Sequence, residues 1–288
     1  MKKHSLLDLK SGGSSIVVPG VYDMISAKLA ERANFPALYV SGYGISAAHL
    51  GLPDVGLMTF SDMFERVQLI ARNSAVPVIA DADTGYGGLI NLRHTVQSYE
   101  SAGVSAIQIE DQEFPKRCAH AAGVRVIEKQ EMMRKIEVAC ESRSDDGFLV
   151  IARTDSLTEF GIDDAIERGK AYAEVGADMI FIEGAKTKQQ LTKIAKSLDA
   201  PLMVKMVPEF NGMDIDGNIL RQLGYDIAIY PSLAFLVAGA AMQAGFRELH
   251  ATGQVRKFSM MEFDAFSEMI GFEEIYEFDK RWNDDKRD

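Results

Sequence analysis

Eight short apolar segments, each followed by a longer stretch of helical periodicity, constrain the fold of this chain most strongly. Each segment is four to six residues long and continuously apolar rather than alternating. Runs of this kind are typical of parallel strands that are buried on both faces. The expected strands are Ile16–Pro19, Ala37–Ser41, Pro77–Ala80, Ala106–Ile109, Phe148–Ala152, Met179–Ile182, Pro201–Met206 and Ile227–Tyr230.

The stretches between these segments predict helices, because their apolar residues follow a helical period. Several end at glycine-containing turns such as Ala102-Gly103. The expected helices are one capped by Asp23 and ending at Arg32, then Ser61–Arg72, Asn91–Ala102, Lys129–Glu141, Asp163–Val175, Lys188–Leu198, a short one near Ile219, and Leu233–Ala244.

Strand and helix thus alternate eight times without a linker, which predicts an α/β fold of the closed (β/α)₈ (TIM) barrel type. The alternative is an open doubly wound sheet, but no Gly-x-Gly-x-x-Gly follows the first strand. We expect a single barrel domain over residues 1–288, because 47% hydrophobic content fills a sizeable core. Residues 260–288 are expected to form a helical tail that is long enough to pack on a neighbouring subunit.

The net charge of −11 argues against nucleic acid or an anionic membrane as a partner. No apolar run reaches the length of a membrane span, and residues 1–10 lack an apolar segment of signal-peptide length. The two cysteines, Cys118 and Cys140, have no spacing typical of a disulfide framework or a zinc site. We therefore expect a cytoplasmic protein that acts on a small molecule.

Acidic residues follow several expected strands, at the end where a barrel carries its functional groups. They are Asp54, Asp81, Asp83, Glu110 and Glu183. Carboxylates this close raise one another's pKa unless a cation lies among them. Oxygen ligands without a His or Cys cluster suit Mg²⁺, with Mn²⁺ as an alternative. The competing interpretation is that these acids cap helices or lie in solvated loops.

Asp81 and Asp83 are two residues apart on a segment expected to be extended, so both should face the same side of the pleat. Asp81 could then bind the metal directly while Asp83 holds a metal-bound water. Arg153, after the fifth strand, is expected to clamp a substrate carboxylate through its planar guanidinium. Ser41-Gly42-Tyr43 could form a backbone pocket because Gly42 has no side chain, or it could be a plain turn.

The loop after the fourth strand, 113–123, is interrupted by Pro115 and ends in Gly123, which favours a mobile lid. Its Cys118 is flanked by three cationic or ionisable residues, Lys116, Arg117 and His120. Positive neighbours favour the thiolate, so Cys118 could act as a general acid or base toward a carbanion. An incidental cysteine beside a basic patch is the alternative.

Six sequence motifs occur in a fixed order along the chain. They are Ser41-Gly42-Tyr43, Leu50-Gly51-Leu52-Pro53-Asp54, Asp81-Ala82-Asp83-Thr84-Gly85-Tyr86-Gly87, Ile109-Glu110-Asp111-Gln112, Lys116-Arg117-Cys118-Ala119-His120 and Ala152-Arg153-Thr154-Asp155. Taken in order, these motifs resemble the isocitrate lyase/phosphoenolpyruvate mutase superfamily over about Val18 to Leu236. Within it they look most like the methylisocitrate lyase and 2,3-dimethylmalate lyase branch.

The resemblance implies Mg²⁺ at Asp81, with Asp54, Asp83 and Glu110 bound through water. It implies a 2-oxo acid held by Ser41, Gly42, Tyr43 and Arg153, and a pocket for a second carboxylate lined by Glu183 and His120. It makes Cys118 the proton donor to the departing carbanion. It also implies a homo-oligomer, a tetramer or a dimer, that exchanges its last helix and so gives Met260–Asp288 a role.

Two positions depart from the branch. Ala119 stands where the lyases usually have Gly, which restricts the backbone and adds a methyl group. Lys205 stands at the seventh strand where the lyases commonly present an Asn. Lys205 could bind a substrate carboxylate as a point charge, or it could pair with Glu183 and close the pocket.

These observations favour an Mg²⁺-dependent oxo-acid lyase that cleaves a 2-hydroxy di- or tricarboxylate to a 2-oxo acid and a second carboxylate. An unassigned base would remove the hydroxyl proton, and Cys118 would protonate the other fragment. P–C bond chemistry of the carboxyphosphonoenolpyruvate mutase type, and oxaloacetate cleavage, are alternatives within the superfamily. A non-catalytic carboxylate-binding protein is the alternative of another class, motivated by Ala119 and Lys205.

Overall fold

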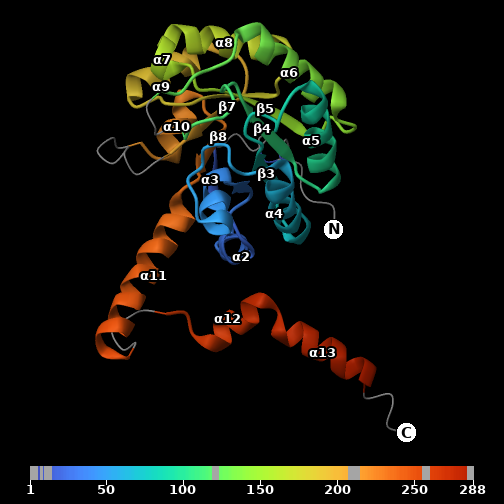
Figure 1. Ribbon diagram of the computed structural model, residues 1–288, viewed down its shortest axis with the longest axis vertical. Coiled ribbons are helices and arrows are strands. Elements are labelled where there is room, and N and C mark those ends of the chain that lie inside the picture. Colours follow the sequence, from blue (N-terminus) through green and yellow to red (C-terminus); the bar gives the residue numbers. More distant parts are fainter. Residues whose placement is uncertain are drawn as a thin grey trace. The chain divides into compact units, whose positions relative to one another are not determined.

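Eight parallel strands close into a barrel in chain order, with β1 paired to β8, as the sequence predicts (Figure 1). The computed structural model describes residues 6, 9, 15–118, 123–206, 215–254 and 260–283. The strands begin and end within a few residues of their predicted bounds. They are β1 Ile16–Val21, β2 Leu38–Val40, β3 Val78–Asp81, β4 Ala106–Glu110, β5 Leu149–Thr154, β6 Met179–Ile182, β7 Leu202–Lys205 and β8 Ile227–Tyr230.

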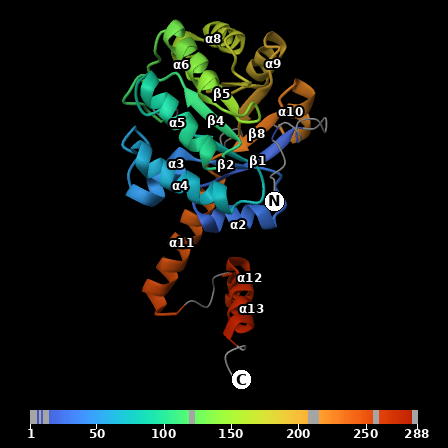
Figure 2. The same cartoon turned by 90° about the vertical axis from the view of Figure 1, so that its right-hand side faces the viewer.

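Helices surround the barrel on its outside, as two perpendicular views show (Figures 1 and 2). Local capping sets where they begin: Asp23 and Ser26 form a capping box on α2, and Thr59 and Asp62 form one on α4. The predicted helices appear as α2 Met24–Arg32, α4 Phe60–Asn73, α5 Leu89–Ser101, α6 Lys129–Ser142, α8 Ile162–Glu174, α9 Lys188–Ser197, α10 Gly217–Leu223 and α11 Leu233–Thr252.

Within the part of the chain that the structure describes from residue 15 on, three short helices were not predicted. They are α3 Gly42–Ile45, the π-helical turn η1 Ser46–Leu50, and α7 Leu157–Phe160. The first two follow β2, where Ser41-Gly42-Tyr43 was expected to form either a backbone pocket or a plain turn. Helix α11 also runs past its predicted end at Ala244 and stops before Gly253, whose φ of 68° is left-handed.

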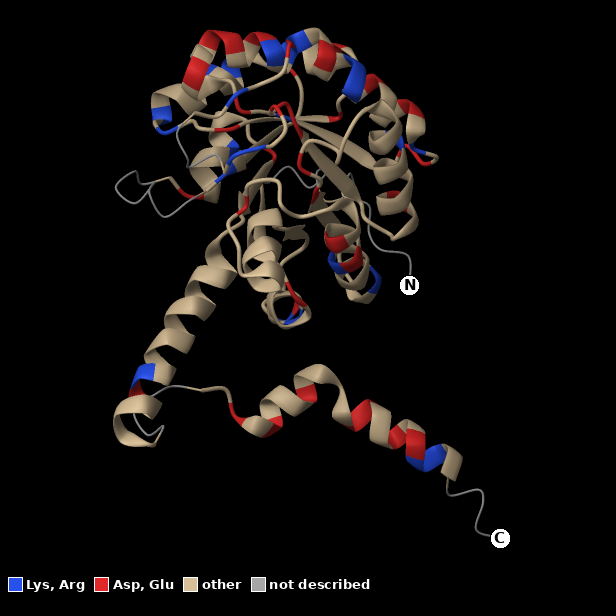
Figure 3. Ribbon diagram, in the orientation of Figure 1, with Lys and Arg blue, Asp and Glu red and all other residues tan. Residues whose placement is uncertain are grey.

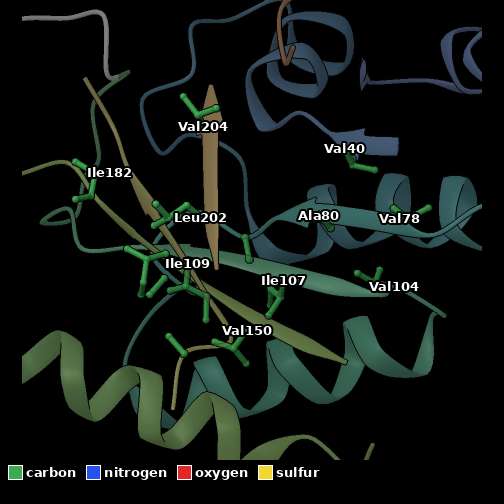
Figure 4. Close-up of a cluster of buried hydrophobic side chains, with 14 of the residues drawn as sticks. Val40, Val78, Ala80, Val104, Ile107, Ile109, Val150, Ile182, Leu202 and Val204 are labelled. Carbon is green, nitrogen blue, oxygen red and sulfur yellow. The ribbon is translucent and has the colours of Figure 1, made fainter. Parts of the chain in front are cut away.

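Side chains along each strand alternate between the barrel interior and the layer beneath the helices. Residues such as Val40, Ile107 and Val204 belong to the outer layer, which Figure 4 shows in part. Their strand neighbours Tyr39 and Met203 belong to a separate cluster inside the barrel. This alternation decides which residues at the strand ends can point into the barrel.

The chain divides into two compact units, residues 1–235 and 236–288. The second unit contains the rest of α11, then α12 Phe263–Ile270 and α13 Phe272–Asn283, so the predicted tail is helical. Exchange of this tail between subunits, and assignment of the whole chain to one domain, stay predictions. Among the described residues, no helix has both the length and the apolar character that a membrane span requires.

Candidate active site

The predicted site residues at four strand ends share the inward parity of their strands. Asp81 ends β3, Glu110 lies at the end of β4, Arg153 is the last but one residue of β5, and Lys205 ends β7. Glu110 and Arg153 are register partners in the sheet. Figure 3 shows acidic residues in the loops at the middle of the barrel as well as on the outer helices. The carboxyl ends of the strands thus bring these four residues to one face of the barrel, as predicted.

Asp81 and Asp83 come together, but not through the pleat that the sequence suggested. The strand ends at Asp81, and Asp83 has a left-handed φ of 48°. The backbone therefore turns, and the amide of Asp83 donates a hydrogen bond to Asp81 Oδ1 over 3.1 Å. The prediction of an extended Asp81–Asp83 segment was wrong, because a tight turn rather than strand alternation aligns the two carboxylates.

Gly42 lies against the carboxylate of Asp81. A Cβ at position 42 would be 2.9 Å from Asp81 Oδ2 and 3.6 Å from Asp83 Oδ1. The neighbouring Ser41 is buried, and its hydroxyl accepts a hydrogen bond from the amide of Gly44 over 3.3 Å, so it caps α3. Tyr43 is 41% exposed, and its ring lies 5.0 Å from that of Phe235. The motif is thus a helix N-terminus beside two carboxylates.

Lys116 lies among the predicted metal ligands. Its ammonium nitrogen is 2.8 Å from Asp54 Oδ1 and also contacts Asp83 Oδ1. Burial raises the pKa of Asp83 to about 6, although the Lys116 charge opposes this. Burial by itself favours the neutral amine of Lys116, yet the carboxylates of Asp83, Glu110 and Asp54 raise its pKa well above the usual value. Lys116 therefore supplies the cation that this carboxylate cluster needs.

Arg153 is held by carboxylates of the protein itself. Asp155 accepts two hydrogen bonds from it, over 2.9 Å to Nε and 2.7 Å to Nη2. Glu110 Oε2 lies 3.4 Å from Nη1, and Glu183 Oε2 lies 3.9 Å from Nη2. Burial alone would lower the pKa of Arg153, but Asp155, Glu110 and Glu183 together raise it well above its usual value. The side chain is thus a fixed, buried cation.

Glu183, which follows β6, also forms an ion pair with Lys205 at the end of β7. The side chains of both residues are largely buried. Of the two arrangements that the sequence left open for Lys205, the structure has the pair with Glu183. The far end of the site therefore has two cations, Arg153 and Lys205, around one glutamate.

The loop after β4 is described as far as Cys118 and again from Gly123. Cys118 is a half-buried free thiol, and the amide of Arg117 beside it donates to Gln112 Oε1 over 2.8 Å. A bridge between Gln112 and Val126 joins the two ends of the loop. Two residues of the predicted motif, Ala119 and His120, lie outside the described residues.

The side chains on this face suit a hard divalent cation by their chemistry. Within the described ranges, no three Asp, Glu, His or Cys side chains surround one point at ligating distance. The donors are carboxylate oxygens, however, and Glu110 Oε1 is buried without a hydrogen-bond partner in the described structure. Mg²⁺ usually binds through few carboxylates and several waters. The residues Asp54, Asp81, Asp83 and Glu110 therefore fit such an ion.

Sequence reasoning gave no role to several buried polar residues of this face. Asp155 orients Arg153, and the hydroxyl of Tyr39 lies 3.3 Å from Gln108 Oε1 inside the barrel. Sequence spacing could have indicated both residues. Asp155 is two residues after Arg153 and Gln108 is two residues before Glu110, so each is expected to face the same side of its strand as that neighbour. Asp111 lies within a motif, but its partners Arg168 and Tyr172 lie far away in the sequence.

Comparison with known proteins places this geometry in a family. The phosphoenolpyruvate phosphomutase family matches residues 6–250. The chain belongs to this family. It is 41% identical over 273 residues to 2,3-dimethylmalate lyase of Eubacterium barkeri, covering 94% of each chain. It is 38% identical over 268 residues to 2-methylisocitrate lyase of Aeropyrum pernix, covering 92% of this chain and 85% of that one.

Two solved structures superpose closely on the chain. Oxaloacetate acetylhydrolase in complex with the inhibitor 3,3-difluorooxalacetate has a TM-score of 0.91 at 33% identity, over 96% of this chain and 95% of that one. A complex of phosphonopyruvate hydrolase with oxalate and Mg²⁺ has a TM-score of 0.87 at 31% identity, over 96% and 98%. The predicted superfamily and barrel are confirmed, and the two similar lyases confirm the prediction of a lyase-like enzyme.

Proposed function

We propose that this family member is an Mg²⁺-dependent carbon–carbon lyase that cleaves a 2-hydroxy di- or tricarboxylate similar to dimethylmalate or methylisocitrate. The products would be a 2-oxo acid and a second carboxylate. The observation that carries the proposal is the array at one barrel face, in which Glu110 at the end of β4 lies beside the fixed cation Arg153 and Asp81 ends the neighbouring strand β3. Similarity to two lyases of this substrate type supports the same reading.

Asp54, Asp81, Asp83 and Glu110 would hold the metal, in part through water. When bound, Mg²⁺ would act as a Lewis acid on oxygens of the 2-oxo acid. The Mg²⁺ and oxalate in a similar structure support this choice of ion and ligand. Lys116 would maintain the balance of charge in the cluster, because its ammonium contacts both Asp54 and Asp83.

The chain's cations would bind the substrate carboxylates. Arg153 would orient one of them, since Asp155 fixes the plane of its guanidinium. The backbone at Gly42 would allow the reacting end of the substrate to approach the carboxylates closely. Binding both ends of the substrate would hold the bond that breaks in a fixed geometry beside the catalytic groups, so that their proton transfers occur within one oriented complex.

Cys118 would complete the reaction as a general acid. A base removes the hydroxyl proton, the carbon–carbon bond breaks, and the electron pair remains on the carbon of the departing carboxylate fragment. The thiol of Cys118 would then give its proton to that carbon. Lys116 and Arg117, which precede it, and His120 are proposed to supply the positive field around this loop.

The Cys118→Ser variant tests this assignment directly. We expect cleavage to fall by about 10²–10⁴-fold, the usual contribution of a general acid. Binding of oxalate with Mg²⁺, measured by calorimetry, should stay near the wild-type value, because the anion site lies at the strand ends. Cleavage at the wild-type rate would show that Cys118 is not the acid, and lost oxalate binding would show that it acts in binding instead.

Oxaloacetate cleavage is a second candidate function, favoured by one observation. The ion pair between Lys205 and Glu183 neutralises the glutamate at the far end of the site. A smaller dicarboxylate such as oxaloacetate would need fewer contacts with Glu183 and Lys205 at that end of the site. The similarity to oxaloacetate acetylhydrolase supports keeping this candidate.

A further inference from the structure

A buried carboxylate, Asp111, lies behind the candidate site and has no part in the reaction proposed above. It follows Glu110 at the end of β4, and its side chain contacts α8 on the outside of the barrel. Asp111 is fully buried. An ionised carboxylate is costly to bury unless it is paired and hydrogen-bonded. The partners of Asp111 therefore indicate its structural role.

Both oxygens of Asp111 are satisfied. Oδ2 accepts hydrogen bonds from the Tyr172 hydroxyl over 2.8 Å and from Arg168 Nη1 over 3.3 Å. Oδ1 accepts from the backbone amide of Asp155 over 2.9 Å. Arg168 and Tyr172 are four residues apart on α8, so one face of the helix presents both donors. Asp111 thus joins α8 to the end of β5.

The contact with β5 leads to Arg153. Asp155, whose amide Asp111 holds, is the residue that binds the guanidinium of Arg153 through two hydrogen bonds. The amide of Asp111 also donates to the carbonyl of Arg153 over 3.2 Å. The carboxylate and the backbone of Asp111 therefore hold both the main chain of Arg153 and the partner that orients its side chain.

The same residue anchors the loop that contains Lys116 and Cys118. The amide of Ile127, at the far end of that loop, donates to the carbonyl of Asp111 over 2.8 Å. Arg168 Nη1 donates to the carbonyl of Ile127 over 2.9 Å. Beside the bridge between Gln112 and Val126, the carbonyl of Asp111 and the guanidinium of Arg168 thus tie the far end of the loop to β4 and to α8.

We propose that Asp111, held by Arg168 and Tyr172, is a positioning residue that sets the orientation of Arg153 and the anchorage of the loop with Lys116 and Cys118. It acts through Asp155 and Ile127 and touches no reacting atom. The proposal rests on the carboxylate-binding role of Arg153 proposed above. Its readout is therefore the binding of an anion rather than turnover alone.

The first test compares Tyr172→Phe with a matched control, Tyr225→Phe. Tyr225 is also buried, and its hydroxyl donates to the carbonyl of Leu191 over 3.2 Å, away from the strand ends. Both variants remove one buried hydroxyl donor, so both should have a lower melting temperature than the wild type. We expect only Tyr172→Phe to weaken oxalate binding in the presence of Mg²⁺, by about tenfold, because small displacements of a positioned group are costly. Equal oxalate affinities of the two variants would overturn the proposal.

A second pair of variants covers the case in which Tyr172→Phe does not fold. Arg143 Nη1 donates to Asp178 Oδ2 over 2.5 Å and to the carbonyl of Phe148 over 2.9 Å, so it repeats the pattern of Arg168 near the opposite end of β5. Arg168→Gln should weaken oxalate binding and Arg143→Gln should not. The same affinity in both variants would again contradict the proposal.

A double-mutant cycle separates positioning from general damage. If Tyr172 acts through Asp155, Tyr172→Phe should change oxalate affinity by less than twofold in an Asp155→Asn background. If the double variant instead loses oxalate affinity by the product of the two single-variant losses, Tyr172 does not act through Asp155. A wild-type protein that binds oxalate but cleaves no substrate would remove the proposed lyase function and leave this test intact, whereas a wild type that binds no oxalate would overturn both.

Discussion

The ammonium of Lys205 at the end of β7 forms an ion pair with Glu183, whose other oxygen lies 3.9 Å from Arg153 Nη2. Glu183 is therefore shared between two cations inside the barrel mouth. The pair neutralises a carboxylate that could otherwise accept hydrogen bonds from a large substrate.

Replacing Lys205 by Asn should therefore shift substrate preference toward larger hydroxy acids. We expect kcat/KM for methylisocitrate to rise relative to that for oxaloacetate by about tenfold, the effect of one buried interaction of about 1.4 kcal/mol. Lys193→Asn serves as a control, because Lys193 pairs with Asp163 on the exposed surface. An unchanged ratio in Lys205→Asn would show that this residue does not select the substrate.

The contacts of Lys116 predict that its removal makes the stability of the protein more dependent on Mg²⁺. Lys116→Met leaves Asp54 and Asp83 without their cation, and breaking a buried pair in this way costs about 3–5 kcal/mol of unfolding free energy. Added Mg²⁺ should restore more melting temperature to this variant than to the wild type, because the ion supplies the missing charge. Lys129→Met, which removes a more exposed pair with Glu167, is the control. A variant insensitive to Mg²⁺ would contradict a metal site here.

Gly42 gives a steric test of the same cluster. A methyl group at position 42 would lie 2.9 Å from Asp81 Oδ2, so Gly42→Ala should displace that carboxylate. We expect a loss of activity of about 10²-fold and weaker Mg²⁺ dependence, since Asp81 is the proposed direct ligand. Gly88→Ala adds a methyl group where no atom lies within 4 Å and should leave activity unchanged. Equal activity of both variants would contradict the expectation that activity depends on the present position of the Asp81 carboxylate.

The two cysteines should differ in reactivity. Burial raises the pKa of the Cys140 thiol, so less of it is thiolate near pH 8 and it should react slowly with iodoacetamide. Cys118, in the loop of the candidate site, should react first, and oxalate with Mg²⁺ should protect it. Mass spectrometry of the labelled peptides measures both rates. Faster labelling of Cys140, or labelling of Cys118 that ignores oxalate, would contradict this arrangement.

Most of the fold could be predicted because its signals are local. Continuous apolar runs fixed the strands, and capping residues such as Asp23 fixed helix starts within a residue or two. The strand ends then located Asp81, Glu110 and Arg153 at one face without knowledge of any contact. Errors arose where the backbone departs from regular alternation, as at Asp83 with its left-handed φ.

Ion pairs between residues that are distant in the sequence could not be predicted. The pairing of Lys116 with Asp54 and Asp83, and that of Asp111 with Arg168, join residues far apart in the chain. No period or spacing relates such residues, because loop geometry and helix docking bring them together. The sequence places Lys205 at the end of a strand, where its side chain could bind a substrate carboxylate or pair with Glu183. Only the side-chain geometry of the structure shows the pair with Glu183.

The central claim, that this chain is a carbon–carbon lyase, is tested most directly by product release. The protein is incubated with Mg²⁺ and one of four compounds: methylisocitrate, isocitrate, 2,3-dimethylmalate or oxaloacetate. For the first three compounds the release of a 2-oxo acid is measured. For oxaloacetate the release of acetate or oxalate is measured. We expect turnover of at least one hydroxy acid that EDTA abolishes and Mg²⁺ restores. Turnover of oxaloacetate alone would favour the second candidate function. Release of product from none of the four would contradict the lyase account.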